Sequence, residues 1–161
     1  MKIAAALSLL VVTPIPWSSD WTFGLPLIVL TLVIHVLGLL FIDEKVARVK
    51  KDVVERYGYR VVFVVIIGAT AMSIALMHGI ETVLWAVIYW IFGALPDYPD
   101  AVLYSLSAMT SYGHANLVLE KRWQLLGALE SLNGMLLFGV TTAFLFGIIQ
   151  RARELQGRRP H

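Results

Sequence analysis

Three long apolar segments constrain this chain more than any other feature. They cover residues 22–42, 61–95 and 124–150, and the only Asp, Glu, Lys or Arg within them are Glu81 and Glu130. About 20 apolar residues of helix are enough to cross the ~30 Å hydrocarbon core of a bilayer. Because 58% of the 161 residues are apolar and only 15% are charged, the composition is typical of a membrane protein. The sequence therefore predicts an all-α membrane protein with three transmembrane helices.

The basic residues predict how these helices are oriented. Ten of the 13 Lys and Arg residues lie in the linker 43–60 or in the tail 151–161. The positive-inside rule places such segments in the cytoplasm. We therefore expect a cytoplasmic C-terminus and, after an odd number of crossings, an N-terminus outside.

The N-terminal segment 1–21 contains a shorter apolar run, from residue 3 to residue 12. This run is too short to cross a bilayer. It could belong to a signal peptide, but the following Thr13-Pro14-Ile15-Pro16-Trp17 offers no small-x-small cleavage site. We expect a retained interfacial or re-entrant segment.

The segment 96–123 differs from an ordinary loop between two spans. It opens with two prolines and two aspartates and continues with an apolar stretch that ends at Met109. A helix over 100–109 would reach roughly 15 Å, about half of the hydrocarbon core. The chain must then return through 110–116 in a non-helical form, which is tolerated at that depth only where it is buried in protein or lines a water-filled path. The pattern predicts a re-entrant helix followed by a pore loop.

Four blocks of sequence resemble small bacterial members of the pore-loop potassium channel superfamily. They are Gly93 to Asp97, Ala101 to Ser111, Trp123 to Glu130 and Asn133 to Gly139, and the likeness covers roughly residues 80–150. The resemblance implies a pore module over 61–150, with an outer helix 61–95, a pore helix 100–109, a filter 110–116 and an inner helix 124–150. It also implies a homotetramer in a bacterial-type inner (plasma) membrane, with the lipid bilayer and further copies of the chain as partners.

The expected selectivity filter departs from the family motif Thr-Thr-x-Gly-Tyr-Gly-Asp. Without a gap, the motif falls on Thr110, Ser111, Tyr112, Gly113, His114, Ala115 and Asn116. A second register would instead align Tyr112-Gly113 with the Tyr-Gly of the motif. Four of the seven positions differ in the ungapped version, so strict potassium selectivity is not implied, and the expected permeant ion is K⁺ or Na⁺.

The resemblance also assigns roles on the inner helix. Gly134 or Gly139 fits the position of a gating hinge, and Thr141 and Thr142 fit the lining of the cytoplasmic half of the pore. Ordinary helix packing explains the same residues equally well, because small residues let helices approach closely.

Three ionisable residues at membrane depth are further candidate site residues, since such groups are often functional. Glu130 either braces the packing as a protonated or hydrogen-bonded acid or acts on ions directly. His78 and Glu81 are spaced i, i+3 and can touch, as a proton sensor or, as we favour, as a polar contact between helices. His35 is expected to make a packing or interhelical hydrogen-bond contact rather than to bind a ligand.

The sequence favours no enzyme, cofactor or nucleic-acid partner. Nucleophile-elbow, His-Glu-x-x-His and phosphate-loop motifs do not occur, and the chain contains no cysteine. The pore-loop pattern and the family resemblance imply passive conduction of a monovalent cation through a tetrameric filter of unusual sequence. The alternative is a non-conducting membrane scaffold or accessory subunit that keeps the channel fold.

Overall fold

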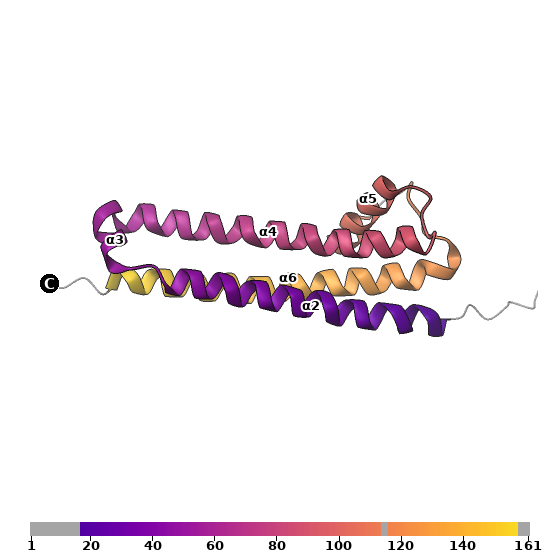
Figure 1. Cartoon of the computed structure of the whole chain (residues 1–161), viewed down its shortest axis with the longest axis horizontal. Helices are drawn as coiled ribbons and strands as arrows, with labels where there is room; N and C mark the ends of the chain where they lie inside the picture. Colours follow the sequence, from indigo (N-terminus) through magenta and orange to yellow (C-terminus); the bar gives the residue numbers. More distant parts are fainter. Residues whose placement is uncertain (1–16, 114–115, 158–161) are drawn as a thin grey trace, which may run out of the picture.

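A computed structural model describes residues 17–113 and 116–157, and helices are the only regular elements in these two ranges (Figure 1). Three of the helices are long, and the other elements connect them. The elements are α2 (Trp17–Ala47), α3 (Lys51–Tyr57), α4 (Tyr59–Ile91), α5 (Tyr98–Met109), the 3-10 turn η1 (Lys121–Trp123) and α6 (Gln124–Gly157).

The three long helices lie side by side along the length of the molecule (Figure 1). Within the described residues, Asp20–Ala47, Tyr59–Ile91 and Lys121–Glu154 are long and apolar enough to cross a membrane. The three predicted membrane helices are therefore confirmed by length and composition. The all-helical fold class is confirmed as well.

The helix ends differ from the predicted boundaries. α2 begins at Trp17 and takes in the last residues of the segment predicted as 1–21, whose first 16 residues lie outside the described part. α6 extends to Gly157 and so includes most of the predicted tail 151–161. The prediction used uncharged runs, but a helix can continue past the lipid into water, where charged side chains are tolerated.

The C-terminal ends of α2 and α6 lie together at one end of the bundle. Arg151 of α6 forms an ion pair with Asp43 of α2. The connection between α2 and α4 contains α3 and turns at Gly58, which has a φ of 81°. The expected cytoplasmic segments 43–60 and 151–157 are thus neighbours, and α5 lies at the opposite end (Figure 1).

α4 ends at Ile91, four residues before the predicted end, because the chain reverses at a glycine. Gly93 has a φ of 63°, which glycine adopts without steric cost. The N–H of Gly93 donates a hydrogen bond of 3.1 Å to the carbonyl oxygen of Trp90. The N–H of Ala94 donates one of 2.9 Å to the carbonyl oxygen of Tyr89. This pair of bonds is a Schellman motif, which closes the helix and turns the chain back.

α5 runs back along α4 and α6, antiparallel to α4. The hydroxyl of Ser105 lies 2.8 Å from the carbonyl oxygen of Thr82, which is nine residues before the end of α4. At the end of α5, Met109 packs against Gly134, ten residues into α6. At 1.5 Å per residue, α5 therefore ends about 14 Å below the ends of the long helices.

α5 is closed by a second Schellman motif at the predicted filter. The N–H of Tyr112 bonds to the carbonyl of Ser107 at 2.9 Å, and the N–H of Ser111 bonds to that of Ala108 at 3.0 Å. Ser111 adopts a φ of 55°, a left-handed conformation that costs a non-glycine residue roughly 1 kcal/mol. The start of the predicted filter is therefore a tight polar turn rather than an extended strand.

The contact at Gly134 generates a first prediction. A Cβ added to Gly134 would lie 2.1 Å from the backbone oxygen of Met109, so Gly134→Ala must push α5 away from α6. We expect a loss of stability of about 1–3 kcal/mol, the usual cost of overpacking, measured by thermal unfolding in detergent.

Gly68→Ala on α4 is the matched control, because a Cβ there meets no atom of the described residues within 4 Å. This variant should be neutral or slightly more stable, since alanine has the higher helix propensity. Equal destabilisation by both variants would contradict the close packing of α5 on Gly134.

Candidate functional site

Two polar clusters lie inside the apolar bundle. The histidine–glutamate cluster consists of His35, His78, Glu81 and Thr141, and the Glu130 cluster consists of Tyr89, Ser105 and Glu130. Both glutamates are fully buried. Buried polar groups in an apolar environment are costly unless they are hydrogen-bonded, so the partners of each carboxyl group define the site.

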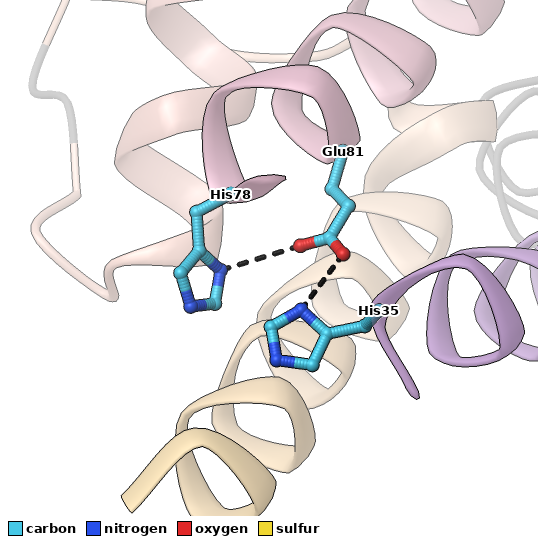
Figure 2. Close-up of side chains that lie close together, drawn as sticks. All are labelled: His35, His78 and Glu81. Atoms are coloured by element: carbon cyan, nitrogen blue, oxygen red, sulfur yellow. Dashed lines mark hydrogen bonds and ion pairs between the residues drawn. The ribbon is translucent and has the colours of Figure 1, made fainter. Parts of the chain in front are cut away.

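In the histidine–glutamate cluster, one carboxyl group faces two imidazole rings (Figure 2). Oε1 of Glu81 lies 2.9 Å from Nδ1 of His35, which comes from α2. Oε2 lies 3.3 Å from Nδ1 of His78, one turn earlier on α4. The contact predicted from the i, i+3 spacing is present, and His35 adds an interhelical partner 46 residues away in the chain.

Thr141 of α6 completes this cluster on the other side of the rings. Its Oγ1 lies 2.8 Å from Nε2 of His35 and 3.4 Å from Nε2 of His78. Each imidazole is therefore placed between Glu81 and Thr141, and the cluster joins α2, α4 and α6. His35 is fully buried, whereas the side chain of His78 is 18% exposed.

In the Glu130 cluster, the carboxyl group joins three helices. Oε2 of Glu130 accepts a hydrogen bond of 2.7 Å from the hydroxyl of Tyr89 on α4, and Oε1 lies within hydrogen-bond distance of the hydroxyl of Ser105 on α5. The single hydrogen of Ser105 is also directed at the carbonyl oxygen of Thr82. A protonated Glu130 that donates to Ser105 satisfies all of these groups at once. This geometry matches the bracing role considered for Glu130.

The predicted filter lies at the end of α5, on the outer surface of the chain. The side chains of Thr110, Ser111 and Asn116 are exposed, and Tyr112 is 81% exposed. Gly113 has a φ of 73°, as expected for a glycine at a turn. His114 and Ala115 lie outside the described residues.

An open hollow of about 500 Å³ lies beside this turn. It is bounded by the end of α5, the segment 117–119 and the first half of α6. Ser111 and Gly113 are among its lining residues. The turn therefore borders open space rather than the core of its own chain.

The four residues predicted as hinge or pore lining divide between two faces of α6, with one glycine and one threonine on each face. Gly134 packs on α5, and Thr141 is buried and bonded to His35, so Thr141 does not face outward as a lining residue would. Gly139 and Thr142 lie on the exposed face. Of the predicted hinge and lining residues on α6, these two are exposed.

Sequence reasoning missed the partners of Glu130. Tyr89 and Ser105 carry ordinary helix-compatible side chains, and nothing in their spacing marks them as partners of a residue on α6. The one available signal was the rule that a buried acid requires donors nearby. That rule predicts that partners exist without identifying them.

Comparison of the chain with protein-family models, with curated proteins and with solved structures finds no match. The function is therefore argued from the geometry of these clusters and of α5.

The hydrogen count in the Glu130 cluster generates a second prediction. Glu130→Gln keeps one donor for Ser105 and one acceptor for Tyr89, so it should preserve stability to within about 1 kcal/mol. Glu130→Leu leaves the hydroxyl of Tyr89 without its buried partner, whereas Ser105 keeps the carbonyl oxygen of Thr82, so the variant should cost about 1–3 kcal/mol. Chemical or thermal unfolding in detergent measures both. If Glu130→Gln lowered the stability as much as Glu130→Leu, the result would contradict a protonated Glu130 in the folded protein.

Proposed function

We propose that the chain is the subunit of a homotetrameric channel for monovalent cations. The observation that carries this proposal is α5, which doubles back beside α4 and α6 and ends in a polar turn about 14 Å below their ends. If the ends of α4 and α6 beside α5 lie at the edge of the ~30 Å hydrocarbon core, this turn lies near its middle.

A polar turn at that depth requires a particular environment. Irregular backbone is tolerated within a membrane only where it is buried in protein or lines a water-filled path. The turn at 110–113 is exposed on its own chain, and Tyr112 projects from it. Further copies of the chain would bury part of the turn in protein and leave the rest lining a water-filled path. Lipid offers neither environment.

The charge of the turn favours a cation over an anion. The carboxyl end of α5 presents the negative end of the helix dipole. The hydroxyls of Ser107 and Thr110 bond back to carbonyl oxygens of the same helix, and residues 98–119 contain no Lys or Arg. Carbonyl and hydroxyl oxygens can replace the hydration shell of a monovalent cation.

A free face of α6 supports assembly. One set of its exposed residues recurs at intervals of four and three, as in a helix that packs along one stripe. This set is Ala128, Leu132, Met135, Gly139, Thr142 and Phe146, and Leu136, Phe138, Ala143 and Gly147 beside it are exposed as well. We place this stripe toward the symmetry axis, with the linker 43–60 and the end of α6 in the cytoplasm, where the positive-inside rule puts basic segments.

Ion flux tests the proposal directly. Purified protein in liposomes should carry a K⁺- or Na⁺-driven current or dye signal, and Gly113→Asp should abolish it, because a side chain is forced into a turn with a φ of 73°. Gly58→Asp is the matched control, since Gly58 has a φ of 81° and lies at the far end of the bundle.

The outcomes of the flux experiment are distinct. Loss of flux in Gly113→Asp together with retained flux in Gly58→Asp supports a conduction path at the turn. Absence of flux in the folded wild-type protein under every ionic gradient, voltage and pH contradicts the channel. That result would favour the non-conducting scaffold instead.

The subunit number provides a separate prediction. Native mass spectrometry of the detergent-solubilised protein should give a mass of four chains, because one turn supplies a quarter of a closed ring. Leu132→Trp and Met135→Trp enlarge the free face of α6 and should reduce the tetramer fraction, whereas Leu76→Trp on α4, also exposed, should not. A stable monomer or dimer would contradict the proposed pore.

A further inference from the structure

The histidine–glutamate cluster brings three metal-ligand side chains together inside the bundle. One ligand atom from each of His35, His78 and Glu81 lies within 4.8 Å of the other two. We propose that these three residues bind a divalent transition-metal ion, with Zn²⁺ as the reference ion. This site is separate from the polar turn and does not depend on conduction.

The distances fit a compact metal site. Donor atoms about 2.0–2.1 Å from a tetrahedral Zn²⁺ lie roughly 3.3 Å from one another. The two Nδ1–carboxylate separations are 2.9 Å for His35 and 3.3 Å for His78. These two separations involve different carboxylate oxygens, and the three ligand atoms lie within 4.8 Å of one another, so the side chains must rotate to place all three donors around one ion.

Thr141 stands where a metal site places its supporting hydrogen bonds. A histidine that binds a metal through one ring nitrogen usually donates a hydrogen bond from the other. Nε2 of both histidines faces Oγ1 of Thr141, at 2.8 Å and 3.4 Å. A hydroxyl oxygen can accept two hydrogen bonds, so Thr141 fixes the Nδ1 atoms of both rings as the ligands.

With both rings neutral, the hydrogen count is incomplete, and either a proton on one ring or a metal ion completes it. If the Glu81 carboxylate accepts an N–H from Nδ1 of each neutral ring, both Nε2 atoms become acceptors. Thr141 has a single hydroxyl hydrogen and can serve only one of them. An ion bound at Nδ1 leaves both Nε2 atoms protonated, and both then donate to Thr141.

The residue types select the class of ion. Imidazole nitrogen and carboxylate oxygen suit Zn²⁺, Fe²⁺ and related first-row ions, whereas Ca²⁺ and Mg²⁺ prefer sites made of oxygen. Two histidines and one glutamate leave a fourth position for water. The side chain of His78 is 18% exposed, so the cluster is partly open at this residue, where Phe138 covers one face of the ring with centroids 5.0 Å apart.

Co²⁺ is the probe that tests the proposal, because tetrahedral Co²⁺ absorbs visible light strongly. The full chain, purified in detergent with an affinity tag that contains no histidine, should bind one equivalent of Co²⁺ and show this absorption. Zn²⁺ should displace the Co²⁺ and raise the unfolding temperature, as expected for a ligand that binds only the folded state.

Substitutions separate the cluster from other binding groups. His35→Gln and Glu81→Gln should weaken binding at least about 100-fold, and Thr141→Val should weaken it about 10–100-fold, as is usual when a supporting hydrogen bond is lost. Glu130→Gln and His114→Gln are the controls and should bind as the wild-type protein does.

The proposal is overturned if wild-type protein with intact helical circular dichroism shows no tetrahedral Co²⁺ spectrum at saturating Co²⁺. It is also overturned if the controls lose binding as strongly as the cluster variants. Metal content and ion flux are measured independently. A protein that binds Co²⁺ but carries no flux would contradict the channel and leave the metal site standing.

Discussion

Two carboxyl groups inside an apolar bundle determine how the helices of this chain fit together. In lipid, apolar helices gain little by burying their surfaces against one another, so polar contacts and close packing decide their arrangement. Glu81 requires a hydrogen-bond partner from α2, and Glu130 requires partners from α4 and α5. A rotation of any of these helices would separate a buried acid from its partners.

The two clusters hold different helices in place along the bundle. The Glu130 cluster fixes α5 on the framework, and thereby sets the position of the turn that follows it. The histidine–glutamate cluster lies nearer the middle of the bundle and attaches α2 to the other two long helices. The pore proposed at the turn and the metal site proposed at the histidines therefore rest on different sets of contacts.

The sequence was sufficient for the features that depend on local composition. Uncharged length predicted the three long helices, and the proline-flanked apolar stretch predicted a short helix that ends at Met109, as it does in the structure. The spacing of His78 and Glu81 predicted their contact. These features depend on neighbours in the chain, which the sequence displays.

The partners of the buried acids could not be predicted in this way. His35, Tyr89 and Ser105 meet Glu81 or Glu130 only because of how each helix is rotated about its axis. Helices that are apolar on all sides carry no periodic pattern that distinguishes an inner face from an outer one. The left-handed Ser111 was missed for a similar reason, because a serine gives no signal for the conformation that ends α5.

The close approach of Met109 to Gly134 also affects how α6 can deform. At Gly134 the helix packs directly against the end of α5, so a bend at this point would break the contact between α5 and α6. Gly139 and Gly147 have open space beside them in the described part of the chain. Bending of α6 at its glycines is therefore confined to the part after Gly134, and the part before it moves together with α5.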